Sequence, residues 1–151
     1  MNNHEMVILI ESIIEESKTV VLATVDKDCI PHMRWVTPCC IRQRAGYIYM
    51  ITSPGLSKIQ HIQNNPMVEM MIQTRQLDKV VNVRGKVFIT DNPLIRSEVL
   101  ECIARNLQSF WKISSSEEDL VVMEMVIEKA HLYLPQKGSR ELVDFESGES
   151  L

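Results

Sequence analysis

The stretch Arg34-Trp35-Val36-Thr37-Pro38 ends a strand-like apolar run with a guanidinium and a large aromatic side chain. One hairpin later, the stretch Thr52-Ser53-Pro54-Gly55-Leu56-Ser57-Lys58 leads from a strand through hydroxyl groups and a glycine turn into a helix. Both stretches place polar and cationic groups where a strand ends. Together they predict a site for a flat, phosphorylated ligand.

The phosphate half of this site depends on the helix that begins near Ser57. Backbone N–H groups at a helix N-terminus are unpaired and carry roughly half a positive charge, so they attract anions. Ser53 and Ser57 add hydroxyl donors. Lys58 adds a mobile charge, and Arg34 adds a planar fork that fits two phosphate oxygens. The pattern is not a Walker A loop, because Gly55 stands alone. The alternative is that Ser57 only caps a surface helix and that Lys58 is solvated.

The composition is that of an ordinary globular protein. A chain of 151 residues has room for one domain with a sizeable core, and 45% hydrophobic with 24% charged residues is usual for a soluble protein. The net charge of −4 argues against non-specific nucleic-acid binding, which needs clustered lysines and arginines. No run approaches the ~18 apolar residues of a membrane span, and the N-terminus lacks a basic region with a cleavage site. We therefore expect a cytoplasmic protein without nucleic-acid or membrane partners.

The cysteines and histidines show no metal-binding pattern. Cys39 and Cys40 are adjacent, so on a strand they would face opposite sides and could not easily share one metal or one bridge. We expect structural, reduced thiols, with a redox or ligand role as the alternative. The histidines are scattered singly, which does not indicate a metal site. The residues concerned are Cys29, Cys39, Cys40, Cys102, His4, His32, His61 and His131.

Apolar periodicity predicts six strands and three helices. Gly85 interrupts an alternating strand and predicts a bulge. The first helix is expected after the caps Asn2 and Asn3, and the third from Asn92 and Pro93. The strands are expected over residues 19–25, 29–41, 47–52, 67–74, 79–90 and 120–134, and the second helix over about 57–63.

This order of elements contains no regular alternation of strand and helix, so a doubly wound sheet is disfavoured. We expect a mainly β, α+β fold: a six-stranded antiparallel split barrel with flanking helices, the first and third packed on its outside. The barrel domain would span residues 1–135. Residues 136–151 are rich in Glu, Ser and Gly and would form a flexible acidic tail.

Several short motifs, in their order and spacing, carry a resemblance that spans roughly residues 19–134. The motifs are Leu22-Ala23-Thr24-Val25-Asp26, Met33-Arg34-Trp35-Val36-Thr37-Pro38, Tyr47-Ile48-Tyr49-Met50-Ile51-Thr52-Ser53, Ser57-Lys58-Ile59, Asn64-Asn65-Pro66-Met67-Val68 and Val83-Arg84-Gly85-Lys86-Val87. With them the chain resembles the pyridoxamine 5′-phosphate oxidase-like family of FMN-binding split barrels, and its general-stress-protein-26-like branch in particular.

The resemblance implies a split-barrel homodimer with FMN at the subunit interface. Arg34 and the backbone of Trp35, Val36 and Thr37 would lie along the isoalloxazine ring and ribityl chain. Gln73 would make a polar contact at the edge of the cofactor, and Trp111 would form a wall from the partner chain. The residues implied to hold the phosphate are Thr52, Ser53, Ser57 and Lys58.

The chain also departs from the family pattern. Full pyridoxamine phosphate oxidases carry a C-terminal substrate-binding segment rich in Arg and His, whereas this chain continues with Gln136-Lys137-Gly138-Ser139-Arg140 and an acidic stretch. Oxidation of vitamin B6 is therefore not expected. No residue stands out as a general acid or base, which suits a flavoprotein because the ring carries the hydride chemistry.

Three classes of function remain open. The first is an oxidoreductase that passes electrons from a nicotinamide to an unidentified small substrate, with F420 in place of FMN as a variant. The second is a flavin-binding sensor or stress protein without turnover. The third is a haem-binding split barrel with His61 or His131 as the axial ligand, which the phosphate-binding pattern of Arg34 and Lys58 disfavours.

Some of these residues also have structural interpretations. Trp35 could pack against the third helix, and Arg34 could pair with a surface carboxylate. The polar strand face over residues 82–86 could simply be solvated. The methionines of two strands are expected in the core or at a dimer interface: Met67, Met70, Met71, Met123 and Met125.

Overall fold

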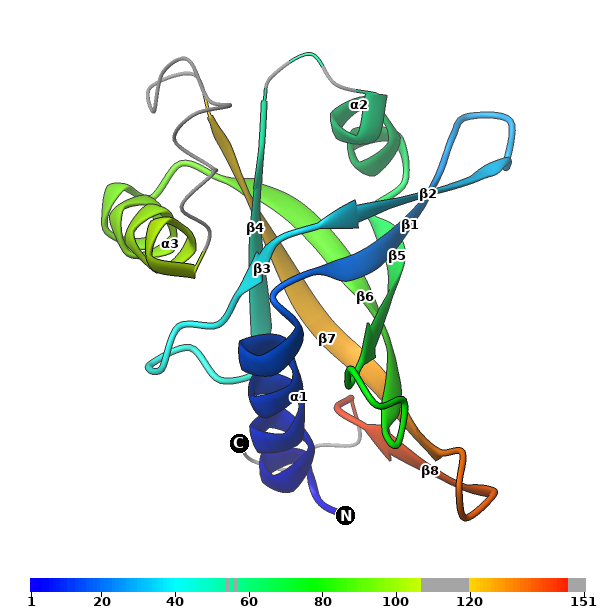
Figure 1. The fold of residues 1–151 in the computed structure, drawn as a ribbon. Coiled ribbons are helices and arrows are strands. Elements are labelled where there is room, and N and C mark those ends of the chain that lie inside the picture. Colours follow the sequence, from blue (N-terminus) through cyan, green and yellow to red (C-terminus); the bar gives the residue numbers. More distant parts are fainter. Residues whose placement is uncertain (54, 56, 107–119, 147–151) are drawn as a thin grey trace.

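The computed structural model describes residues 1–53, 55, 57–106 and 120–146. Within these residues, one antiparallel sheet curls into a split barrel with three helices around it (Figure 1). In chain order the elements are α1 (Asn3–Ser17), β1 (Val20–Val25), β2 (Pro31–Val36), β3 (Pro38–Cys39), β4 (Tyr47–Thr52), α2 (Ser57–Asn64), β5 (Met67–Gln73), β6 (Val80–Thr90), α3 (Pro93–Asn106), β7 (Val121–Leu134) and β8 (Ser139–Asp144).

The sheet runs in the order β2-β1-β5-β6-β7-β4-β3, and its two end strands are consecutive in the chain. Only Thr37 separates β2 from β3. The sheet therefore curls back on itself, and residues 31–39 connect its ends. β7 is central to this arrangement: it pairs with β6 on one side, and on the other side with β4 and then with β8.

Helix α1 begins at the cap expected from the sequence. The side chain of Asn2 accepts a hydrogen bond of 2.8 Å from the backbone N–H of Glu5, and the Glu5 carboxylate accepts one of 3.3 Å from the backbone N–H of Asn2. This reciprocal pair satisfies two N–H groups that would otherwise lack a partner. The helix buries one stripe of apolar side chains, including Met6, Ile10 and Ile13, and packs against β5 and β8.

The predicted bulge at Gly85 is confirmed. The register of β6 against β7 shifts between Arg84 and Gly85. A Cβ atom built on Gly85 would lie 2.0 Å from the carbonyl oxygen of Val126, so the two backbones approach too closely for any side chain. On either side of the bulge Val83 and Val87 are buried, as the alternating pattern predicts, whereas Ile89 near the strand end is partly exposed.

Two strand expectations differ from the structure. The single strand expected over 29–41 is broken at Thr37, because β2 pairs with β1 whereas Pro38 pairs with Met50 of β4. The segment from Gln136, expected as a flexible tail, contains β8, which pairs with β7 after a turn through Gly138 (φ +64°). Its residue Val143 is buried. The described residues therefore form eight strands instead of six.

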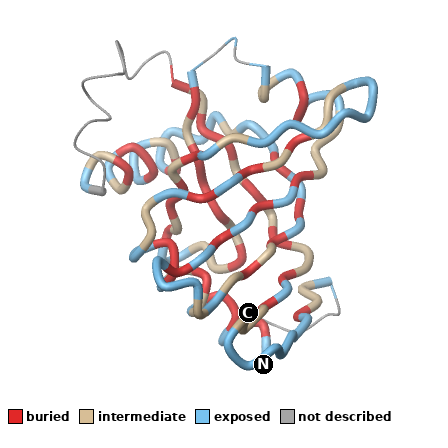
Figure 2. Tube along the Cα trace, turned by 45° about the vertical axis from the view of Figure 1, so that its right-hand side comes forward, coloured by how far each residue is buried: buried red, intermediate tan, exposed pale blue. Residues whose placement is uncertain are grey.

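The buried side chains form two clusters. The larger lies inside the curled sheet and against α1, where Figure 2 shows buried positions concentrated along the crossing strands. The smaller joins β3, β4 and α3 around Cys39, Tyr49 and Val99. Met70, Met123 and Met125 are fully buried, whereas Met71 is exposed on the outer face. No helix in the described part of the chain is long and apolar enough to cross a membrane.

Candidate functional site

Arg34 lies on the inner face of β2, under helix α2. Its register partner on β1 is Leu22, and its guanidinium Nη1 donates to Thr24 Oγ1 at 2.7 Å and to the carbonyl oxygen of Leu22 at 3.3 Å. The side chain is half-buried, and burial lowers the pKa of the guanidinium from its usual value. Two contacts with β1 therefore fix the guanidinium in place.

Lys58 brings a second cation to the same region. It is the second residue of α2 and is half-buried. Burial lowers the pKa of its ammonium group, and the nearby positive charge of Arg34 lowers it further. Among the described residues, neither Arg34 nor Lys58 forms an ion pair with a carboxylate. Two desolvated cations without a carboxylate attract an anion.

Three hydroxyl groups border the turn between β4 and α2. Thr52 ends β4 and is buried, and its Oγ1 has no hydrogen-bond partner within the described residues. A buried hydroxyl without a partner is costly unless a ligand satisfies it. Ser53 and Ser57 are exposed at the two sides of the turn. Gly55 adopts a left-handed conformation with φ +84°, which explains the glycine at this position.

The structure therefore fits a phosphate group at this place. The turn brings the Thr52 hydroxyl and the N-terminus of α2 to the end of β4. A phosphomonoester accepts hydrogen bonds from hydroxyls, backbone N–H groups and cations. Its negative charge would neutralise Arg34 and Lys58, which form no ion pair with a carboxylate among the described residues.

Trp35 does not share the inner face with Arg34. Its side chain lies on the outer face of β2, is 67% exposed, and is opposite Val21 of β1 in the strand register. Val36 points into the core and is buried, so only its backbone is open to a ligand. Thr37 is half-buried at the junction between β2 and β3. The four consecutive residues thus face different surroundings.

Two other predicted residues lie outside this group. Gln73 ends β5 on the outer face of the sheet, opposite Val80 of β6, so it is not brought to Arg34 or Lys58 within one chain. Trp111 falls outside the described residues.

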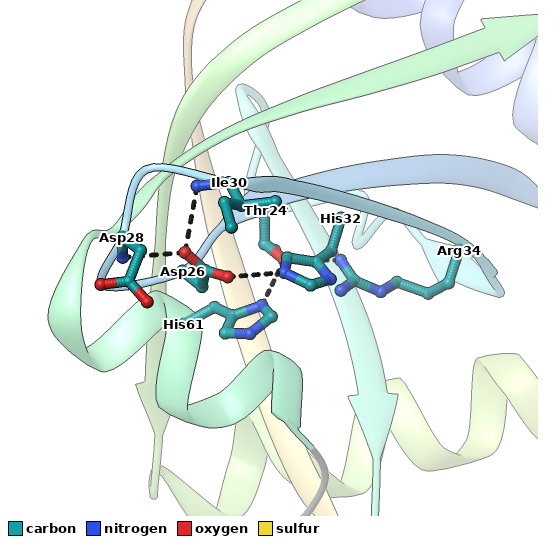
Figure 3. Close-up of polar contacts among 7 residues, drawn as sticks. All are labelled: Thr24, Asp26, Asp28, Ile30, His32, Arg34 and His61. Carbon is teal, nitrogen blue, oxygen red and sulfur yellow. Dashed lines mark hydrogen bonds and ion pairs between the residues drawn. The ribbon is translucent and has the colours of Figure 1, made fainter.

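A polar network that the sequence analysis missed adjoins Arg34 (Figure 3). Asp26 Oδ2 lies 2.8 Å from His32 Nε2, and the His32 ring packs against the His61 ring with centroids 4.6 Å apart and planes tilted by 37°. His61 is buried, and its Nδ1 lies 2.9 Å from Thr24 Oγ1. The network thus runs from Asp26 to the hydroxyl that holds Arg34.

One hydrogen-bond direction in this network follows from chemistry alone. A guanidinium can only donate, so Thr24 Oγ1 accepts from Arg34. A hydroxyl has one proton and two lone pairs, so the direction of the bond between Thr24 Oγ1 and His61 Nδ1 follows the tautomer of His61. Burial lowers the pKa of His61, and the charges of His32 and Arg34 lower it further, which favours the neutral imidazole.

The strand register was the signal that could have revealed this network. Thr24 is the direct cross-strand partner of His32, and His32 lies two residues before Arg34. Side chains two apart on a strand share a face, so the three groups had to converge once β1 and β2 were paired. His61 joins them only through the tertiary packing of α2 on β1, which the sequence does not reveal.

Comparisons with known proteins agree with this fold. A model of the family described as Pyridoxamine 5′-phosphate oxidase matches residues 7–133. No curated protein matches the sequence significantly. Among solved structures, the chain is similar to General Stress Protein 26 from Bacillus anthracis str. Sterne (21% identity, TM-score 0.71, covering 91% of this chain and 98% of that one).

Two further solved structures of the same fold carry different descriptions. One is described as an F420 Reductase (19% identity, TM-score 0.66, covering 80% of this chain and 94% of that one). Another is a heme binding protein from Mycobacterium smegmatis (12% identity, TM-score 0.71, covering 89% of this chain and 57% of that one). At such identities the likeness concerns the fold alone.

Proposed function

Because the chain belongs to the pyridoxamine 5′-phosphate oxidase family, we propose that it binds FMN and acts as an oxidoreductase between a nicotinamide donor and a small substrate. The observation that carries this proposal is the pair of cations, Arg34 and Lys58, which no carboxylate neutralises among the described residues. FMN ends in a phosphomonoester, which supplies the missing negative charge.

The phosphate would be held by both side chains and backbone. Lys58 and the hydroxyls of Thr52, Ser53 and Ser57 border the turn that leads into α2, and the N-terminal N–H groups of that helix add further donors. Each charge-assisted hydrogen bond contributes about 1.5–3 kcal/mol. Several of them together would give the tight binding expected of a resident cofactor.

Arg34 would orient the cofactor because its own position is fixed. Thr24 and the Leu22 carbonyl accept hydrogen bonds from the guanidinium. Thr24 is in turn hydrogen-bonded to His61, whose ring packs against that of His32. A side chain immobilised before binding loses little conformational entropy when the ligand arrives. Bound FMN would supply the hydride and electron transfer, and the chain would supply position and electrostatics.

A homodimer is part of the proposal. On the outer face, Trp35, Val21 and Met71 are register partners across β2, β1 and β5, and all three are exposed. Met33, two residues before Trp35, is 73% exposed. A contiguous apolar patch of this kind on a sheet indicates a protein partner, and the family resemblance favours a second copy of the chain.

The other cofactors remain alternatives with distinct spectra. F420 and haem are named for two proteins of the same fold, and a flavin sensor without turnover would use the same phosphate site. His61 does not favour haem, because its ring is buried between Thr24 and the His32 ring. Among the described residues, no contact supports haem as directly as Arg34 and Lys58 support a phosphate group.

The experiment that tests the proposal is an absorption spectrum of the purified protein, repeated after FMN and then NADH or NADPH are added. Flavin bands near ~450 nm that bleach with a nicotinamide are the expected result. Flavin that binds and does not bleach would favour the sensor or another donor. A Soret band near ~400 nm would show that the protein binds haem in place of FMN. No chromophore after FMN addition would overturn the cofactor assignment.

A further inference from the structure

Cys39, Cys40 and Cys102 line one hollow where α3 packs near β3. The hollow has a volume of about 320 Å³, and the Glu11 and Glu15 side chains of α1 border it. Cys40 and Cys102 also line a neighbouring hollow of about 290 Å³. Neither hollow includes Arg34 or Lys58 in its lining, so the cysteines belong to a different part of the molecule from the candidate phosphate site.

Cys39 and Cys102 are in direct contact across two elements. Cys39 is fully buried in the apolar cluster between β3, β4 and α3, and Cys102 packs against that cluster from α3. The Cys39 S–H group donates a hydrogen bond to the Cys102 sulfur. Arg105, almost one helical turn further on, donates to the same sulfur. Cys102 is only half-buried, so a small reagent can reach it from the hollow.

The surroundings make the two thiols unequal. The hydrogen bond from Cys39 lowers the pKa of Cys102, and Arg105 lowers it further, against the opposing effects of burial and the charge of Glu15. The same hydrogen bond, followed by burial, raises the pKa of Cys39. Cys39 is fully buried, whereas Cys102 is half-exposed beside Arg105, so Cys102 is the thiol of the pair that ionises more readily. Reactive cysteines are found in such positively charged, partly exposed surroundings.

We propose that Cys39 and Cys102 form a redox-active dithiol, in which Cys102 is oxidised by a hydroperoxide and Cys39 then closes an intramolecular disulfide between β3 and α3. The site is separate from the FMN site and does not depend on it. It adds a modification site, and a peroxide as its reagent, to the proposed function.

The chemistry balances in two steps. The Cys102 thiolate attacks the terminal oxygen of the hydroperoxide, so an S–O bond forms, the O–O bond breaks, and the leaving alkoxide or hydroxide takes up a proton. Cys102 is then a sulfenic acid, oxidised by two electrons, and the peroxide is reduced. The Cys39 sulfur next attacks the Cys102 sulfur, an S–S bond forms, and the departing hydroxide takes the Cys39 proton and leaves as water.

The hydrogen bond also explains how Cys39 can act second. The largest cause of its raised pKa is its bond to the Cys102 sulfur. Once Cys102 is a sulfenic acid, that sulfur no longer carries the charge that holds the Cys39 proton. Cys40 is a poorer candidate for this step, because it packs against the larger buried cluster, whereas Cys39 and Cys102 share the smaller one. Cys29 lies in an exposed turn away from the hollow.

The test treats the fully reduced protein with a limiting amount of hydrogen peroxide and then blocks the remaining thiols with an alkylating agent. Intact mass should show the loss of two hydrogen atoms and two alkylated cysteines in place of four. A non-reducing digest should yield one cross-linked pair that contains Cys39 and Cys102. Cys39→Ser should accumulate a sulfenic acid at Cys102 that dimedone captures, and Cys102→Ser should form no disulfide.

Cys29→Ser and Cys40→Ser are the matched controls and should form the disulfide as the unchanged protein does. Circular dichroism checks that each variant is folded. A disulfide between two chains, a Cys39–Cys40 link, or oxidation that reaches Cys29 before Cys102 would overturn the proposal. Peroxide that leaves all four thiols open to alkylation would overturn it as well.

Discussion

Arg34 and Trp35 are adjacent in the chain, yet their side chains lie on opposite faces of β2. The Arg34 guanidinium donates to Thr24 on the inner face, and Trp35 is exposed on the outer face beside Val21. One short strand therefore serves two surfaces, a cationic site inside and an apolar patch outside. A substitution at Arg34 should therefore affect ligand binding, and a substitution at Trp35 should affect the association of two chains.

Lys58→Ala should weaken FMN binding by about 10- to 100-fold, because it removes one charge-assisted contact of about 1.5–3 kcal/mol. The fold should be unchanged, since Lys58 has no hydrogen bond or ion pair among the residues described. Quenching of FMN fluorescence during a titration measures the affinity. Lys79→Ala, an exposed lysine before β6, is the matched control. Equal affinity in the Lys58 and Lys79 variants would contradict the phosphate assignment.

Trp35→Glu should convert the proposed dimer into a monomer, because it places a charge in the exposed apolar patch. Sedimentation velocity or light scattering measures the mass in solution. Leu94→Glu is the control, since Leu94 is 75% exposed at the start of α3, away from the patch. A monomeric unchanged protein, or a dimer that survives Trp35→Glu, would mean that the patch has another role.

Gly85→Ala should destabilise the fold by about 2–4 kcal/mol, because the new methyl group would overlap the Val126 carbonyl oxygen and force β6 away from β7. Urea unfolding measures the change in the free energy of unfolding. Gly138→Ala is informative beside it, since a Cβ there meets no atom and the only cost is the left-handed backbone. If alanine lowers the stability equally at the two glycines, the Val126 carbonyl oxygen does not exclude a side chain at position 85.

Asp26→Asn should lower stability near neutral pH, and the loss should shrink as the medium becomes acidic. His32, and then the backbone N–H of Ile30, lower the pKa of Asp26 to about 2. An unfolded aspartate titrates near ~3.9, so the unfolded state binds more protons between these values. The contribution of Asp26 is therefore complete above about pH 4 and disappears as the pH falls towards 2.

Urea unfolding of both proteins over this acidic range measures the effect. Asp28→Asn is the matched control, because Asp28 is exposed and its bond to Asp26 comes from the backbone. A stability difference that stays constant down to the lowest pH would show that the Asp26 carboxylate is not responsible.

Local signals predicted most of the fold. The cap at Asn2 and the bulge at Gly85 could be identified because each depends on neighbours in the sequence or on one residue's missing side chain. The break at Thr37 could not be predicted, since it depends on which strand each half of residues 31–39 pairs with. β8 was missed because its charged composition concealed the buried Val143.

In the candidate site too, local signals revealed some residues, and contacts between distant parts of the chain hid the others. Arg34 and Lys58 were identified because each carries a charge near the end of an apolar strand or the start of a helix. The grouping of Thr24, His32 and His61 beside Arg34 was missed, because it arises only through strand pairing and the packing of α2 on β1. The assignment of Thr52, Ser53, Ser57, Gln73 and Trp111 to a cofactor stays a prediction.

The central place of β7 has a consequence for the order of synthesis. The residues around Arg34 and Lys58 lie between positions 22 and 61, so the ribosome makes them before β6 and β7. β4 can pair with β3 at once, but its second partner forms only when residues 121–126 emerge, and β8 pairs with β7 only after that. A nascent chain would therefore expose the edges of β4 and β6 until the residues of β7 have been made. Premature termination before β7 should leave an open, aggregation-prone sheet, because unpaired strand edges invite pairing between chains.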